Sequence, residues 1–189
     1  MANKYVSQND LLYNNLIDFY SKNPQNLKKM LGIINGESKI SLRIVDWFAT
    51  NYSKKYYTLY NIVNDNNNEV KRFKVYIDYK LKLKAYSKKR FDPFCRWERI
   101  SIPYEEGKCI QTTLGQLNFF KWAIENQVID YIERHHKEIE DDMNSRNSSS
   151  RKKELQSDSK QTRKKREELS ILASKSIKKE DVEIVVKFT

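Results

Sequence analysis

The sequence predicts an α+β fold with N-terminal short helices, a central antiparallel β-hairpin or small sheet, a long helix packed on it, and a basic C-terminal tail. Three patterns support this prediction. Apolar residues recur at helical spacing over residues 1–54, strand-like alternation follows up to residue 86, and a capped helical pattern begins near residue 113. The 189 residues suffice for one domain and a tail. We therefore expect a single α+β domain over 1–144, with a helical part at 1–54 and the hairpin and long helix at 55–144.

Three short helices are expected in the first 54 residues. Residues 9–22 carry apolar side chains at helical spacing, and Ser7 or Asn9 is a suitable N-cap. Asn23-Pro24 ends this helix and starts a second one, because proline is favoured at the first helical position. The second helix is predicted to end at Asn35-Gly36, and a third to begin at Ser38 or Ser41.

The pattern then changes from a helical to a strand period. Residues 56–63 are rich in residues that favour strands, and the asparagine-rich run 64–68 is typical of a turn. Residues 73–86 alternate, with apolar side chains on one face and mostly lysines and tyrosines on the other. The two runs predict a hairpin with one long, half-buried strand. A further short strand is predicted over 99–103.

A long helix is expected from Thr113 to about Met143. Thr113 and Gln116 fit a capping box, and apolar residues then recur at helical spacing. Residues 145–162, rich in serine and basic residues, predict a disordered basic linker. The tail, 163–189, is predicted to contain a short helix at 163–175 and a terminal strand at 182–188 that could pair with the sheet edge.

Positive charge is concentrated in two segments. The formal net charge is +11, and residues 70–99 alone carry 11 basic and 3 acidic side chains. Residues 151–166 carry 8 basic and 2 acidic side chains, whereas residues 101–150 have an acidic excess. This asymmetry favours an anionic partner, and it also favours contact between oppositely charged segments or copies.

The basic strand is the best candidate for a binding site. Side chains on one face of a strand recur every ~6.6–6.8 Å, which is close to the phosphate spacing of an extended nucleic-acid strand. Basic side chains could contact phosphates while tyrosines stack on bases. A solvated outer face of the sheet and contact with an acidic protein remain alternatives. We predict nucleic-acid contact by Lys74, Tyr76, Lys80, Lys82, Lys84, Tyr86, Lys88, Lys89, Arg90 and Arg96.

The tail carries a second basic cluster, Lys164-Lys165-Arg166. It resembles a nuclear-localisation cluster and also suits a flexible nucleic-acid-binding arm. The alternative is a merely soluble linker. We include Lys164, Lys165 and Arg166 among the predicted nucleic-acid contacts.

Catalytic and metal motifs are weak. Glu133 and His136 have the E-x-x-H spacing of di-iron helices, but such a site needs a second motif. Asp92 and Glu106-Gly107-Lys108 loosely follow the Asp…Glu-x-Lys layout of a Mg²⁺-dependent nuclease class, although their surroundings predict turns rather than adjacent strands. None of the four glycines forms a phosphate-binding loop motif. We predict no catalytic residue, metal, cofactor or small-molecule substrate.

The sequence also predicts the compartment. The first twenty residues lack the basic start and apolar stretch of a signal peptide, and no apolar run approaches the ~20 residues needed to cross a bilayer. Alanine at position 2 excludes N-myristoylation. The two cysteines, Cys95 and Cys109, are too few for a disulfide scaffold. We expect an intracellular protein without a membrane partner.

Three stretches carry a resemblance to a known family. They are 34–41 continuing through 46–48 and 51–52, then 81–96, then 112–124, including Leu81-Lys82-Leu83-Lys84-Ala85-Tyr86 and Thr113-Leu114-Gly115-Gln116. The chain resembles a small, functionally uncharacterised protein family of nucleocytoplasmic large DNA viruses, over roughly residues 30–143. The resemblance implies a product made in an infected host cell, in the cytoplasm, viral factory or nucleus, and either packaged in the virion or used in genome handling.

The leading hypothesis is a non-enzymatic nucleic-acid-binding accessory protein that acts in viral genome handling or transcription. The main alternative is a virion structural or minor capsid-associated protein, whose basic segments would contact acidic protein surfaces or a second copy of the chain. A Mg²⁺-dependent nuclease is a remote alternative.

Overall fold

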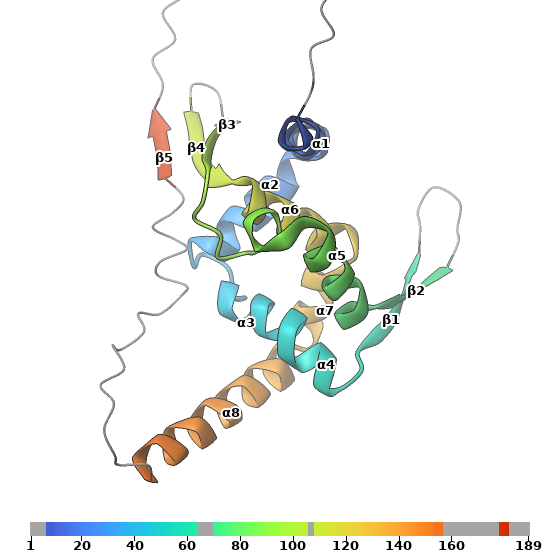
Figure 1. The fold of residues 1–189 in the computed structure, drawn as a ribbon, viewed down its shortest axis with the longest axis vertical. Coiled ribbons are helices and arrows are strands. Elements are labelled where there is room, and N and C mark those ends of the chain that lie inside the picture. The colour runs from blue at the N-terminus through green and yellow to red at the C-terminus, as the bar shows by residue number, and fades with distance from the viewer. Residues whose placement is uncertain (1–6, 64–69, 106–107, 157–177, 182–189) are drawn as a thin grey trace, which may run out of the picture.

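The computed structural model of the chain describes residues 7–63, 70–105, 108–156 and 178–181. It confirms the α+β class, because helices and two small antiparallel sheets make up the described residues. The helices gather around α6 (Leu114–Glu125), and the first sheet, a hairpin, projects from the helical body at the right of Figure 1.

The two N-terminal helices match the prediction. Helix α1 (Gln8–Lys22) begins after Ser7, whose side chain forms a capping box with Asp10. Helix α2 (Pro24–Ile34) begins with proline, and the Asn23 side chain accepts a hydrogen bond from the Gln25 amide.

The third helical segment also matches, but its period changes along its length. Helix α3 (Leu42–Trp47) is capped by the Ser41 side chain, which accepts from the Ile44 amide at 3.3 Å. It continues as a π-helical turn, η1 (Phe48–Tyr52), and a last turn, α4 (Ser53–Lys55). The π-turn widens the helix and buries Phe48 and Tyr52.

The predicted hairpin exists, but the long strand over 73–86 is wrong. Strand β1 (Leu59–Val63) pairs antiparallel with β2 (Val70–Lys74), from Leu59 opposite Lys74 to Val63 opposite Val70. After Lys74 the chain turns into helix α5 (Val75–Arg90). The hairpin is therefore short, and the basic segment is mainly a helix.

Local preference and packing explain the helix. Beyond Ile77 the segment up to residue 86 contains no β-branched residue and is dominated by Leu, Lys and Ala, which are strong helix formers. A helix also places Val75, Tyr79 and Tyr86 on one side, against the body of the protein. A longer β2 would have no partner in the sheet, because β1 begins at Leu59. The helix leaves Ile77 and Leu81 exposed, although the strand pattern placed them on the buried face.

The second sheet has the order β3–β4–β5. Strand β3 (Arg99–Glu105) confirms the short strand predicted over 99–103, and β4 (Lys108–Thr113) pairs with it. Strand β5 (Lys178–Asp181) pairs with β4, so a C-terminal segment does return to the sheet edge. The predicted strand at 182–188, the short helix at 163–175 and the basic cluster 164–166 lie outside the described residues.

The single long helix predicted from Thr113 is three helices, which are α6, α7 (Val128–Arg134) and α8 (His136–Gln156). Gln127 adopts a left-handed backbone, with φ 53°, and interrupts the helical path after Asn126. Asparagine commonly ends helices, so this signal was present in the sequence. Helix α8 also covers residues 145–156, where the sequence predicts a disordered linker, and the rest of that linker lies outside the described residues.

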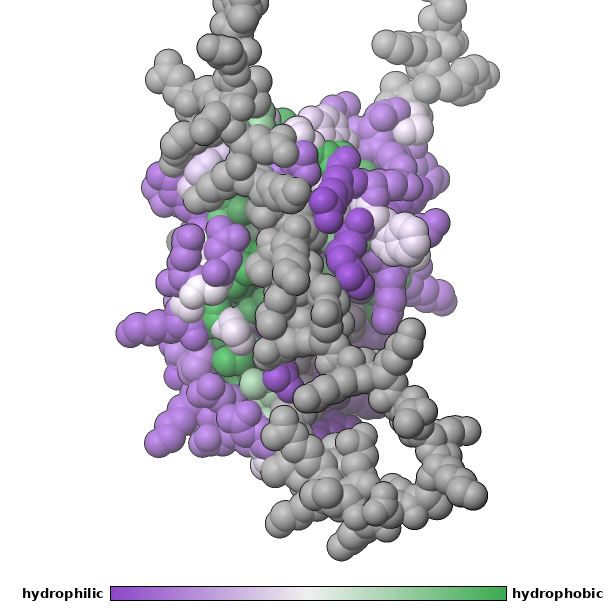
Figure 2. Space-filling view, turned by 90° about the vertical axis from the view of Figure 1, so that its left-hand side faces the viewer, coloured by the Kyte–Doolittle hydropathy of each residue, from purple (hydrophilic) through white to green (hydrophobic). Residues whose placement is uncertain are grey.

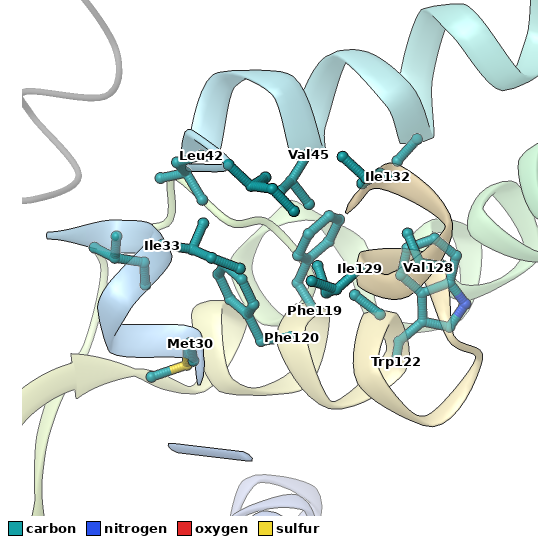
Figure 3. Close-up of a cluster of buried hydrophobic side chains, with 14 of the residues drawn as sticks. Met30, Ile33, Leu42, Val45, Phe119, Phe120, Trp122, Val128, Ile129 and Ile132 are labelled. Carbon is teal, nitrogen blue, oxygen red and sulfur yellow. The ribbon is translucent and has the colours of Figure 1, made fainter. Parts of the chain in front are cut away.

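Helix α6 forms the centre of the hydrophobic core. Nine of its twelve residues are buried, among them Phe119, Phe120 and Trp122. Figure 3 shows these rings facing side chains from α2, α3 and α7. The Phe119 ring centroid lies 5.4 Å from that of Phe91, in the loop after α5, and 5.5 Å from that of Trp122.

Figure 2 shows the face at the left of Figure 1, where hydrophobic residues are visible to the left of the middle and hydrophilic residues surround them. Among the described helices, none has the length and apolar character needed to span a membrane.

Candidate nucleic-acid interface

Helix α5 distributes the predicted site residues over two sides rather than one face. Lys80 and Lys84 are exposed, and they share the outer side with Ile77 and Leu81. Lys82 is only half-exposed and lies beside α1 and α6. The strand geometry that placed Lys80, Lys82 and Lys84 in one row is therefore wrong.

The outer side of α5 carries an open hollow with a mixed basic and apolar lining. Ile77 is 54% exposed and Leu81 61% exposed, so two large apolar side chains lie together on this surface. The side chains that line this hollow are Tyr76, Ile77, Lys80, Leu81, Leu83 and Lys84. The Lys54 ammonium lies 5.7 Å from the centroid of the Tyr76 ring, in a cation–π contact.

Basic residues continue at both ends of α5. Strand β2 exposes Lys71, Arg72 and Lys74 beside the start of the helix, and Lys88 and Lys89 are exposed at its end. Arg90, also in the predicted set, donates to the Gln8 side chain at 3.4 Å, and Arg96 is exposed in the following loop.

The cations around α5 differ from several lysines elsewhere in the described residues, which form ion pairs with acidic side chains. Lys22 pairs with Asp18, Lys29 with Asp130, and Lys121 with Glu125. The cations around α5 have no ion pair with an acidic side chain of the described residues. They are Lys54, Lys71, Arg72, Lys74, Lys80, Lys82, Lys84, Lys88 and Lys89.

A sharp backbone turn directs the last basic residues of α5. Ser87 has φ 59° and ψ 169°, a conformation tolerated mainly by glycine, so the path bends before Lys88. The Cys95 thiol donates to the Lys89 carbonyl oxygen at 3.3 Å, and the Asn118 amide donates to the Arg90 carbonyl oxygen at 2.8 Å. The bent segment is thus held against α6.

The beginning of α6 fixes the same bend. The Asp92 amide donates to the Gly115 carbonyl oxygen at 3.2 Å, and the Gln116 side chain donates to the Pro93 carbonyl oxygen at 3.3 Å. A Cβ atom at Gly115 would lie 2.7 Å from the Cys95 Cβ and 3.0 Å from the Lys89 carbonyl oxygen. Only glycine permits this close approach.

Two half-buried carboxylates lie near the bend. Burial, together with repulsion from Asp92, raises the pKa of Asp46 to about 6, although Lys88 partly offsets the rise. Burial also raises the pKa of Asp92, while a hydrogen bond from the Phe94 amide, at 2.7 Å, and the charge of Lys88 oppose the rise. Lys88 therefore faces acidic groups on its inner side, although it forms no ion pair with them.

The residues of the predicted nuclease pattern do not form a site within the described residues. Asp92 caps its own turn through Phe94, and Glu106 lies outside the described residues. No group of three or more His, Cys, Asp or Glu side chains is arranged to hold a metal ion in the part of the chain that the structure describes.

Sequence reasoning did not identify the contribution of α1 and α6. Asn15, Asn118 and Trp122 line a hollow together with Lys82 and Tyr86, which lie far from them in the sequence. No local pattern could have found this grouping, because it depends on how α5 packs on two other helices.

The three stretches that carry the family resemblance converge at the bend. Asp46 comes from the first stretch, Lys88 and Asp92 from the second, and Gly115 from the third. The fold and this surface define an α+β protein in which the basic helix α5 lies against a buried central helix and follows a hairpin whose second strand is basic.

Residues 1–187 match a family of unknown function, DUF7197, and the chain belongs to this family. The chain is 44% identical over 146 residues to the uncharacterized protein L507 of Acanthamoeba polyphaga mimivirus, an alignment that includes 75% of the chain and 56% of the mimivirus protein. The chain therefore spans only part of that relative's length. These matches support the resemblance to an uncharacterised family of large DNA viruses, and the family match extends beyond the expected residues 30–143. No solved structure matches the chain.

Proposed function

We propose that the protein is a non-enzymatic nucleic-acid-binding accessory protein, and that β2, α5 and the bend after α5 form its binding surface. One observation carries the proposal, which is that exposed cations cluster there without ion pairs to acidic side chains of the described residues. Unpaired cations attract phosphates at little cost, because no internal ion pair has to break and condensed counterions are released from the nucleic acid.

The helix supplies a different contact geometry from the predicted strand. Lys80 and Lys84 lie about one helical turn apart, close to 6 Å along the axis. Each lysine could therefore contact a separate phosphate, while β2 and Lys88-Lys89 extend the contact at the two ends of the helix. Tyr76, at the rim of the outer hollow, offers a ring for stacking on a base.

The biological setting of the proposal comes from the resemblance to large DNA viruses. A protein of this kind would serve viral genome handling or transcription in the host cytoplasm, the viral factory or the nucleus. The basic cluster Lys164-Lys165-Arg166 would add a second contact.

A second candidate function is a virion structural or interaction protein. The exposed apolar side chains of Ile77 and Leu81, flanked by Lys80 and Lys84, favour this candidate. Such a surface suits a protein partner that is apolar at the centre and acidic at the rim.

A salt titration tests the proposal. Fluorescence anisotropy with a labelled duplex and a labelled single strand measures the Kd of the wild type and of the double variant Lys80→Glu, Lys84→Glu. We expect the variant to bind at least tenfold more weakly, and its plot of log K against log salt to be shallower by about two, since two phosphate contacts are lost.

The matched control is Lys28→Glu, Lys137→Glu, which makes the same charge change at exposed sites on α2 and α8. If the control and the α5 variant weaken binding equally, net charge alone drives the association and the α5 surface is wrong. If the wild type binds neither probe at low salt, and instead forms a stable oligomer, the structural candidate replaces the proposal.

A further inference from the structure

A groove runs between α1 and α5 and is separate from the outer side of α5. It consists of two hollows that share Leu12, Asn15 and Tyr86 in their lining. The smaller one, about 80 Å³, reaches down to Asn118 and Trp122 of α6, and the larger one, about 380 Å³, opens toward Gln8 and Arg90.

The groove holds a cation without a partner. Lys82 is half-buried, and no ion pair or hydrogen bond engages it within the described residues. Lys121, which lines the same hollow, is instead paired with Glu125 and lies 4.8 Å from the centroid of the Phe19 ring. A half-buried ammonium that has lost part of its hydration favours an anionic ligand.

The remaining lining suits a planar, hydrogen-bonding group. The Tyr86 ring is half-buried and nearly parallel to the Phe91 ring, at 6.3 Å between centroids, so its orientation is fixed. Asn15 is exposed at the edge of the groove, and an amide can donate and accept toward the edge of a base. The floor is rigid, because the Trp122 indole donates to Asp78 at 2.7 Å.

We infer that this groove binds a single nucleotide, with the base against Tyr86 and Asn15 and the phosphate near Lys82. The inference deepens the proposed function and rests on it, because an unpaired or terminal nucleotide of a nucleic acid held on α5 would reach the groove on the inner side of the same helix. A free nucleotide has the same chemistry, so the test separates the two sources.

The test uses the full chain and four probes, AMP, GMP, CMP and UMP. Amide chemical-shift titrations locate and measure binding, and we expect saturable shifts confined to α1, α5 and α6. Lys82→Met should weaken mononucleotide binding at least fivefold, and Asn15→Ala should change the preference among the four bases. The control Lys28→Met removes one charge from an exposed site on α2 and should leave mononucleotide binding unchanged.

The experiment distinguishes a failure of the groove inference from a failure of the proposed function. Absence of saturable mononucleotide binding, with salt-dependent oligonucleotide binding retained, would overturn the groove alone. Equal effects of Lys82→Met and Lys28→Met would also overturn it, since they indicate nonspecific attraction. Mononucleotide binding without oligonucleotide binding identifies a free nucleotide as the ligand and overturns the proposed function. Competition of an oligonucleotide with the mononucleotide identifies the strand as the source.

Discussion

Helices α5 and α6 lie against each other but differ in almost every property. Helix α6 buries nine of its twelve residues, whereas α5 buries only Val75 and Tyr79. Helix α6 supports the core, and α5 carries unpaired cations and exposed apolar side chains on its outer side. We therefore expect α6 to determine stability and the outer side of α5 to determine binding. Changes in α6 should destabilise the protein, and changes on the outer side of α5 should leave the fold intact.

The largest expected effect comes from Phe119→Ala in α6. Phe119 is fully buried and contacts the rings of Phe91, Phe120 and Trp122. Its truncation should lower the free energy of unfolding by about 3–5 kcal/mol, because it leaves a cavity in a packed core. The matched change Leu81→Ala on α5 should alter it by less than about 0.5 kcal/mol. Urea unfolding measures both, and similar losses would contradict the contrast.

A smaller effect is expected where the two helices meet, for Gly115→Ala. The new methyl group would lie 2.7 Å from the Cys95 Cβ, so the bend after α5 would have to move. We expect a loss of about 1–3 kcal/mol in the free energy of unfolding. Gly32→Ala in α2 is the control, since nothing lies within 4 Å of a Cβ there, and it should stabilise the helix by about 0.5–1 kcal/mol. Equal effects at the two glycines would show that the bend adapts freely.

An effect of similar size but opposite sign is expected from Asp46→Asn, beneath the bend. The pKa of Asp46 is raised to about 6, so the folded protein binds this proton more tightly than the unfolded chain does. The carboxylate therefore costs stability above pH 6, and this cost disappears as the pH falls toward 4. The variant should be more stable than the wild type by roughly 1–3 kcal/mol at pH 8 and nearly equal at pH 4. A pH-independent difference in urea unfolding would show that Asp46 acts through packing instead.

Much of the fold could be predicted wherever short-range signals dominate. The caps at Ser7, Asn23 and Ser41 set the helix starts because each side chain satisfies a backbone amide locally. Thr113 begins α6 for the same reason, at 3.2 Å from the Gln116 amide. These contacts involve residues no more than three positions apart, so the sequence alone contains them.

The error over residues 73–86 has the opposite origin. Alternation of apolar and polar residues suits a strand, but a strand also needs a backbone partner, and β1 provides one only as far as Leu59. The helix preference of Leu, Lys and Ala, together with packing on α6, then selects the helix, and the packing is not visible in a sequence pattern. The basic residues of the candidate site were predicted correctly as a segment, but their division between an outer side and an inner groove depended on this packing.

The β1–β2 hairpin has a consequence for the behaviour of the protein in solution. Among the described residues no third strand pairs with either edge, and open edges invite association between chains. Lys71, Arg72 and Lys74 place charge along β2, where repulsion between copies opposes such association. The same cations that would attract phosphates would thus also oppose self-association. Neutral substitutions in β2 should therefore promote aggregation, whereas glutamate substitutions should remove the attraction and preserve solubility.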